Sequence, residues 1–249
     1  MNNIGNDQPH SLFISDLHLC ASRPAITQAF LNFLKTDAKQ AEKLFILGDL
    51  FEYWAGDDDL DHPDHQNIIQ ALKTLYQHTA IYFIHGNRDF LIGKAFSQAT
   101  GATILSDPSE LDLYGHRVLL SHGDALCTDD VEYQAFKKLV RTQDWQSKFL
   151  SQPLSQRKAQ IEELRKKSEQ EKSHKSSIIM DINAQALATL LETFNYPTLF
   201  IHGHTHRPAV HQLNLANHHC TRIVLGDWYE QGSCLRLDEK GFRNIPIQL

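Results

Sequence analysis

The stretch Ser11-Leu-Phe-Ile-Ser-Asp-Leu-His18 joins a short apolar run to two side chains that can bind metal. Similar apolar runs recur at Leu44-Phe-Ile-Leu47, Ile81-Tyr-Phe-Ile84, Val118-Leu-Leu120, Leu199-Phe-Ile201 and Ile223-Val-Leu225. Near-continuous apolar strands of this length are typical of a sheet that is covered on both faces. Between the first three runs, residues 24–40 and 64–78 carry apolar side chains at helical spacing. This alternation of strand and helix predicts an α/β fold.

Side chains of the metal-ligand type follow five of these runs in succession. They are Asp16, His18, Asp49, Asn87, His122, His204 and His206. Because ligands bind at the carboxyl ends of strands in open α/β sheets, we expect these seven side chains to converge on one site. Their mixed oxygen and nitrogen donors favour Mn, Fe or Zn over Ca, and the two oxygens of Asp49 could bridge two ions. The pattern therefore predicts a pair of adjacent metal ions, an arrangement that clamps the oxygens of a displacement at phosphorus.

The composition is that of an ordinary globular chain. It has 249 residues, of which 41% are hydrophobic and 22% charged, so one domain with a buried core is expected over residues 1–249. The formal net charge of -6 offers no general basic surface, and we expect no nucleic-acid partner. No run approaches the roughly 18 uninterrupted apolar residues of a membrane helix. Residues 1–10 lack the pattern of an export signal, which predicts a cytoplasmic location.

Residues 131–181 differ in character from the rest of the chain. They hold no strand-like run, and apolar residues such as Phe136 and Trp145 are scattered among polar ones, which predicts a helical cap inserted into the domain. Residues 157–175 carry seven Lys and Arg against four Glu, a local charge of +3. From the residues alone, the apolar side chains of the cap either pack on the main body or shelter an apolar ligand. The acidic run Asp57-Asp58-Asp59 lacks the spacing of a calcium loop and is interpreted as a solvated loop.

Five short motifs, D-x-H, G-D, G-N-x, H-G and G-H-x-H, stand in the order that is typical of the calcineurin-like metallophosphoesterase superfamily. From Ser11 to about Trp228 the chain resembles that superfamily. Longer stretches are more closely similar to its family of UDP-2,3-diacylglucosamine diphosphatases, which act in lipid A synthesis in Gram-negative bacteria. These stretches are Ser15-Asp-Leu-His-Leu-Cys20, Ile46-Leu-Gly-Asp-Leu-Phe-Glu52, Gly56-Asp-Asp-Asp59, Phe83-Ile-His-Gly-Asn-Arg-Asp-Phe-Leu91, His122-Gly-Asp-Ala-Leu-Cys-Thr-Asp-Asp130 and Ile201-His-Gly-His-Thr-His-Arg-Pro-Ala-Val-His211. The resemblance implies a sandwich of two β-sheets flanked by helices, with the cap at about residues 131–181 as an insertion.

The resemblance also implies a reaction, the hydrolysis of the diphosphate of UDP-2,3-diacylglucosamine to UMP and 2,3-diacylglucosamine 1-phosphate. A hydroxide held by two Mn²⁺ ions would attack the uridine-side phosphorus, and Fe or Zn are the alternative metals. One ion would be bound by Asp16, His18, Asp49 and His206, and the other by Asp49, Asn87, His122 and His204. The implied substrate contacts are Asn87, Arg88, Asp130, Ser168, Lys172, Lys175 and His204, although relatives often carry Asn in the cap at the position of Lys172.

Three of these residues, Asn87, Arg88 and His204, are expected to take part in catalysis. Arg88 stands where many superfamily members carry a histidine that acts as a general acid. Because arginine does not readily donate a proton at neutral pH, we expect Arg88 to stabilise negative charge on the phosphate instead.

The resemblance favours a cap that binds lipid. Its apolar residues would shelter the acyl chains, and its basic segment would approach the phosphates or the anionic cytoplasmic face of the inner membrane, where attachment would be peripheral. Two alternatives stay open. One is a related dimetal phosphodiesterase or phosphatase that acts on a soluble nucleotide or a phosphoprotein. The other is a binding module that kept the fold without catalysis, which is disfavoured because none of the seven candidate ligands is missing.

Overall fold

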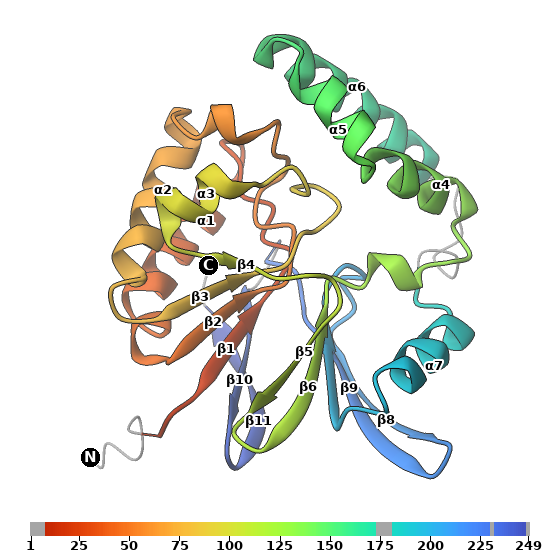
Figure 1. The fold of residues 1–249 in the computed structure, drawn as a ribbon. Helices are drawn as coiled ribbons and strands as arrows, with labels where there is room; N and C mark the ends of the chain where they lie inside the picture. Colours follow the sequence, from red (N-terminus) through yellow and green to blue (C-terminus); the bar gives the residue numbers. More distant parts are fainter. Residues whose placement is uncertain (1–7, 173–180, 230–231, 248–249) are drawn as a thin grey trace.

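The computed structural model describes residues 8–172, 181–229 and 232–247. Its strands form two sheets that lie against each other, with helices on the outside (Figure 1). The first sheet has the strand order β11-β10-β1-β2-β3-β4, and the second has the order β5-β6-β7-β9-β8. This architecture confirms the predicted α/β sandwich of two sheets.

The first sheet is built around parallel strands. It contains β1 (Ser11–Ile14), β2 (Lys43–Ile46), β3 (Ala80–Phe83), β4 (Thr103–Ile104), β10 (Gly232–Asp238) and β11 (Gly241–Ile247). Strands β1 to β4 run parallel, whereas β10 pairs antiparallel with both β1 and β11. Its outer face is covered by α1 (Pro24–Lys35), α2 (Pro63–Leu75) and α3 (Lys94–Thr100) (Figure 1). Both α1 and α2 begin at a proline, which suits a first turn because its missing N–H would have no partner there.

The second sheet mixes parallel and antiparallel pairs. Its strands are β5 (Ser109–Leu113), β6 (His116–Ser121), β7 (Leu199–His202), β8 (Ala209–Leu215) and β9 (His218–Val224). Strands β6, β7 and β9 run parallel, and β5 and β8 add antiparallel edges. Helix α7 (Ala184–Thr193) buries Leu187 and Leu191 in one apolar cluster with Phe200 of β7. This cluster holds the helix on the outer face of the sheet.

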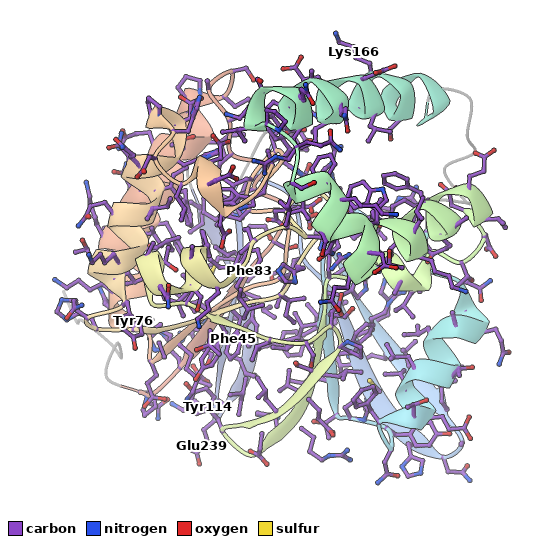
Figure 2. The ribbon with its side chains drawn as sticks, turned by 45° about the horizontal axis from the view of Figure 1, so that its top comes forward. Phe45, Tyr76, Phe83, Tyr114, Lys166 and Glu239 are labelled. Carbon is purple, nitrogen blue, oxygen red and sulfur yellow. The ribbon has the colours of Figure 1, made fainter. Side chains whose placement is uncertain are left out.

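The main core lies between the two sheets. Phe13 and Phe45 of the first sheet share a buried cluster with Leu120 and Ile201 of the second. The rings of Phe13 and Phe45 are stacked, with centroids 4.9 Å apart, and Figure 2 shows Phe45 inside the body of the molecule. The opposite face of the first sheet is buried against α1, α2 and α3. Burial on both faces explains why the strands read as continuous apolar runs.

Three helices form the cap, which stands at one end of the molecule (Figure 1): α4 (Val131–Val140), α5 (Gln143–Leu150) and α6 (Leu154–Lys172). Phe149 of α5 is buried in the same cluster as core residues of the first sheet, and the ring of Trp145 stacks on it at 4.7 Å. Part of the apolar surface of the cap therefore packs on the main body. Among the described helices, none is both long enough and apolar enough to cross a bilayer.

The interpretation of residues 57–59 as a solvated loop is wrong. They form a short 3-10 helix, η2 (Asp57–Asp59), whose carboxylates have partners inside the protein. Asp57 accepts hydrogen bonds from the backbone N–H groups of Ala95 (2.8 Å) and Phe96 (3.1 Å) at the start of α3. Asp59 is buried and lies 2.7 Å from the ammonium group of Lys158. The acidic run thus fixes one helix of the core and one helix of the cap.

The basic segment of the cap is also less free than its composition indicates. Arg157 is only 1% exposed, pairs with Asp58 and donates to the carbonyl of Ala55 (2.5 Å). Lys166, in contrast, is exposed at the outer edge of the cap (Figure 2). Arg157 and Lys158 therefore attach the cap to the core and are not part of an open basic face, while contact of the rest of the segment with phosphates or a membrane stays a prediction.

Candidate metal centre

The candidate ligands lie at the carboxyl ends of strands from both sheets. Asp16 and His18 follow β1, Asp49 follows β2, Asn87 follows β3, His122 follows β6, and His204 and His206 follow β7. Strands β1, β2 and β3 are parallel to one another, and β6 is parallel to β7, so their ends point to the same edge of each sheet. The packing of the two sheets brings all seven side chains together, as expected.

The ligand loops have an unusual backbone conformation. Five candidate ligands have a positive φ, between 50° and 69°: Asp16, His18, Asp49, His204 and His206. Residues other than glycine rarely occupy this left-handed region, and those that do cluster at functional sites. At Gly48, which has a φ of 88°, an added Cβ would lie 2.6 Å from backbone atoms of Gly86. Glycine is required there because the β2 and β3 loops approach each other closely.

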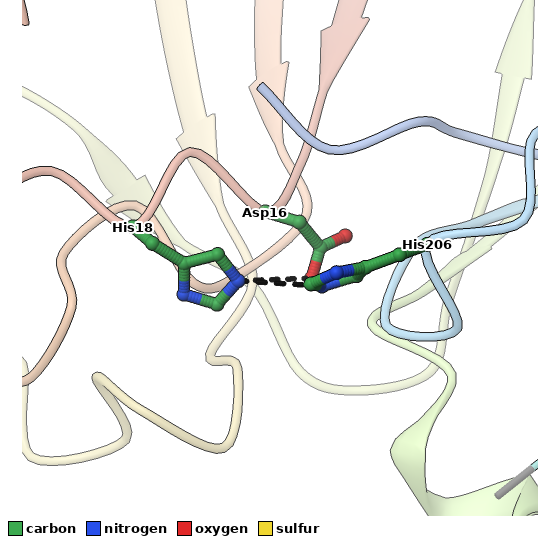
Figure 3. A group of neighbouring side chains, drawn as sticks. All are labelled: Asp16, His18 and His206. Atoms are coloured by element: carbon green, nitrogen blue, oxygen red, sulfur yellow. Dashed lines mark hydrogen bonds and ion pairs between the residues drawn. The ribbon is translucent and has the colours of Figure 1, made fainter. Parts of the chain in front are cut away.

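Asp16, His18 and His206 form the first group of donors (Figure 3). The Nε2 atoms of the two histidines are 3.3 Å apart. The Oδ1 atom of Asp16 is 3.3 Å from Nε2 of His206 and 3.9 Å from Nε2 of His18. Three donor atoms that surround one point at these spacings can ligate a single cation.

Asn87, His122 and His204 meet on the other side of Asp49. The amide oxygen of Asn87 lies 3.1 Å from Nε2 of His122 and 3.0 Å from Nδ1 of His204. Asp49 places Oδ1 3.8 Å from Nε2 of His122 and Oδ2 3.9 Å from Nδ1 of His18. Its two oxygens thus face the two groups, which is the geometry that a bridging carboxylate needs.

The electrostatics of this donor set fit bound cations. The Nδ1 atom of His18 is buried and has no hydrogen-bond partner within the described part of the chain. Burial raises the pKa of Asp49 to about 7, and the neighbouring carboxylates of Asp89 and Asp16 act in the same direction, against His122. Positive charge between the carboxylates would stabilise their ionised forms. The residues present therefore fit two divalent ions.

Asp89 holds two ligand loops together and was not among the predicted site residues. It is fully buried and accepts hydrogen bonds from the backbone N–H groups of Gly86 (2.9 Å), Asp49 (3.3 Å) and Leu50 (2.7 Å). Its one signal in the sequence is its place two residues after Asn87. That signal gives no hint that Asp89 also binds the β2 loop.

Two of the candidate ligands are oriented through their second ring nitrogen. His122 donates from Nδ1 to the carbonyl of Leu47 (2.8 Å), and Nδ1 of His206 lies 3.4 Å from the carboxylate of Asp227. Partners of this kind fix the ring and direct the other nitrogen to the metal. Asp227 stands two residues after the strand-like run 223–225, a place after a strand that it shares with the predicted ligands.

Arg88 lies beside the candidate metal centre, but its side chain contacts the carboxylate of Glu52. Its backbone N–H donates to Oδ1 of Asp49 (2.8 Å), which helps to orient the bridging group. Its guanidinium lies 3.3 Å from the carboxylate of Glu52. Glu52 ends one of the stretches that carry the family resemblance, yet no role was predicted for it.

Helix α4 borders the metal centre. Asp124, which is buried two residues after His122, accepts a hydrogen bond from the hydroxyl of Tyr133. The ring of Tyr133 is nearly parallel to that of His204, with centroids 6.1 Å apart. A small pocket joins Asn87 to the α4 side chains Tyr133 and Phe136. The cap therefore forms part of the wall of the site.

The other predicted substrate contacts belong to the cap. Asp130 is the N-cap of α4, where its carboxylate accepts from the backbone N–H of Tyr133 (3.2 Å). Ser168 is exposed on α6, and Lys172 ends that helix with a side chain outside the described part of the structure. Lys175 lies outside the described residues. Substrate binding by these residues stays a prediction.

A two-sheet sandwich with paired donor groups at its strand ends defines the class of calcineurin-like phosphoesterases. The sequence profile with that description matches residues 10–208, and the chain belongs to this family. Three curated relatives carry the more specific name UDP-2,3-diacylglucosamine hydrolase. That of Aromatoleum aromaticum is 51% identical over 232 residues, which cover 93% of this chain and 94% of the relative. Those of Aeromonas hydrophila (49% identical, 90% and 93% covered) and Escherichia coli (48% identical, 91% and 94% covered) are similar over the same extent.

Proposed function

We propose that this protein hydrolyses UDP-2,3-diacylglucosamine to UMP and 2,3-diacylglucosamine 1-phosphate, as a step of lipid A synthesis. The observation that carries the proposal is the pair of donor groups on either side of Asp49, in a chain about half identical to hydrolases named for this substrate. Two Mn²⁺ ions are the proposed cofactors. Asp16, His18, Asp49 and His206 would hold one, and Asp49, Asn87, His122 and His204 the other.

The proposed chemistry divides between the ions and the residues around them. When bound, the ions would activate water and neutralise charge on the phosphate oxygens. Burial is the main cause that lowers the pKa of His204 to about 3, so its imidazole stays neutral and keeps a lone pair for coordination. Arg88 brings a guanidinium with five N–H donors to the edge of the site, where it would neutralise charge on the diphosphate.

The surface of the cap supports a lipid substrate. Within the described part of the chain, five of the eight exposed large apolar side chains belong to the cap: Val131, Phe136, Leu139, Leu150 and Leu164. Shelter from water stabilises an acyl chain by roughly 0.8 kcal/mol per CH₂ group. Phe149 packs on the core, whereas these five side chains are exposed and could shelter the acyl chains of the proposed substrate.

The proposed substrate is tested by measurement of kcat/KM with purified protein and Mn²⁺. The lipid nucleotide, dissolved in detergent, is compared with UDP-N-acetylglucosamine. We expect kcat/KM to be at least about 100-fold higher for the lipid nucleotide, because burial of a few CH₂ groups already contributes that factor. In H₂¹⁸O the label should appear in UMP, since the uridine-side phosphorus is attacked. Equal rates on both substrates would instead indicate a phosphodiesterase of soluble nucleotides.

We also propose that the protein binds peripherally to the cytoplasmic face of the inner membrane, through α4. Val131 (72% exposed) and Leu139 (55% exposed) are eight residues apart on one face of this helix, and exposed Lys138 lies on the same face. Apolar side chains flanked by lysine suit the boundary of an anionic leaflet. This surface replaces the basic segment of α6, whose Arg157 and Lys158 have partners in the core.

Substitution of both apolar residues, Val131→Glu with Leu139→Glu, is expected to weaken binding to anionic liposomes by at least about tenfold. A loss of about 1.4 kcal/mol in binding free energy corresponds to a tenfold lower affinity, and the variant loses apolar contact and gains repulsion from the anionic lipids. Sedimentation with phosphatidylglycerol vesicles at low and high salt measures it. Val210→Glu is the matched control, because Val210 is a similarly exposed apolar residue (45%) on β8. Wild-type protein that stays in the supernatant at low salt would contradict the attachment.

A further inference from the structure

Glu52 lies outside the candidate ligand set, yet three arginines converge on its carboxylate. Glu52 is 8% exposed. Arg23 donates from Nη2 to Oε2, and both Arg88 (3.3 Å) and Arg165 (2.5 Å) donate to Oε1. One carboxylate thus lies against three guanidinium groups at a largely buried position. The cluster keeps a local excess of two positive charges next to the metal centre.

Each of the three arginines belongs to, or contacts, a different part of the molecule. Arg23 also donates to the backbone carbonyl of the candidate ligand His18 (2.6 Å). Arg88 directly follows the candidate ligand Asn87. Arg165 belongs to α6 and therefore extends from the cap to the core. Glu52 is the point at which two ligand loops and the cap meet.

The guanidinium donors of this cluster are not all used by Glu52. Nη1 of Arg23 and Nε of Arg165 are buried and have no hydrogen-bond partner among the described residues. The carboxylate therefore fixes the direction of the arginines while positive charge remains for an anionic ligand. Without Glu52, three like charges would repel one another at short range in a region that water screens poorly.

From this geometry we propose that Glu52 is a positioning residue for Arg88. It holds the guanidinium at the edge of the metal centre and connects that position to the cap through Arg165. The proposal rests on the proposed function only for the choice of substrate, because any phosphate ester bound at the centre would meet Arg88 in the same place.

A double-mutant cycle tests this role. Glu52→Gln keeps the size of the side chain and one oxygen acceptor, but it removes the charge. We expect it to lower kcat by about 10–100-fold, the range for residues that orient a functional group, with a smaller change in KM and with metal content and thermal unfolding unchanged. In the Arg88→Ala background, the same substitution should lower kcat by less than about threefold, because the residue that it positions is absent.

Two further variants separate positioning from attachment of the cap. Asp58→Asn removes another ion pair between cap and core, that with Arg157, and is expected to leave kcat unchanged relative to the wild type and, in the Arg88→Ala background, relative to Arg88→Ala alone. Glu52→Asp keeps the charge on a side chain one methylene shorter and should give an intermediate loss. This variant also carries the test if Glu52→Gln does not fold.

Equal losses of kcat with and without Arg88 would overturn the proposal, because Glu52 would then act on some other group. Turnover above that of the wild type would overturn it as well, since Glu52 would then withhold Arg88 from the substrate. The cycle is measured both with the lipid nucleotide and with a soluble aryl phosphodiester. Wild-type activity on the diester alone would refute the proposed substrate, while the cycle on that diester would still decide the role of Glu52.

Discussion

Asp49→Ala is expected to lower kcat by about 10⁴-fold or more, the largest effect of any single ligand substitution. The carboxylate oxygens of Asp49 face the two donor groups, at 3.8 Å from His122 and 3.9 Å from His18, so its removal would take one ligand from each of the two proposed ions. A single charged stabiliser in an active site contributes about 10²–10³ to kcat, and here two ions would be weakened together. Turnover of the lipid nucleotide and elemental analysis of metal per chain measure the effect.

The matched control is Asp61→Ala, which removes an exposed carboxylate. It should keep two ions per chain and wild-type turnover. For the wild type, a chelator should abolish activity and added Mn²⁺ should restore it. If Asp49→Ala kept two ions per chain, its role as a bridge would be wrong.

The convergence of the seven candidate ligands could be predicted from the sequence because each signal is local. Asp16 and His18, for example, follow the apolar run of β1 within four residues, and parallel strands carry such residues to a common edge. The helical cap could be predicted for a similar reason, because the absence of strand-like runs in residues 131–181 is also a local signal. Residues 131–172 form three helices in this interval. The specific substrate came from the resemblance, because a donor set of this kind can serve many phosphate esters.

What the sequence could not predict depends on contacts between distant residues. Arg157 and Asp58 are 99 positions apart, and nothing in a count of charges shows that they neutralise each other. Strand β10, near the C-terminus, pairs with β1 near the N-terminus. The first sheet therefore contains two strands, β10 and β11, that were not predicted from a local sequence pattern. Glu52 and Asp89 were missed for the same reason: they bind partners in segments that only the fold brings together.

Arg88→Ala is expected to lower kcat by about 10²–10³-fold without loss of metal. Every substitution at this position except proline keeps the backbone N–H that donates to Asp49, so the bridging carboxylate retains its hydrogen bond. What the variant loses is the guanidinium, which would form charge-assisted hydrogen bonds to the phosphate as negative charge grows in the transition state. The measurement pairs single-turnover rates with metal per chain.

Arg88→Lys distinguishes charge from geometry at the same position. Lysine keeps the positive charge but lacks the planar fork that binds two oxygens at once, and it cannot reproduce the donor geometry toward both Glu52 and a phosphate. We therefore expect a rate between those of the wild type and the alanine variant, with both ions retained. A variant that loses metal but keeps its activity per bound metal would assign Arg88 to support of the ligand loop rather than to stabilisation of charge. That result would also remove the reason for Glu52 to hold the guanidinium beside Asn87, so the two sets of measurements check each other.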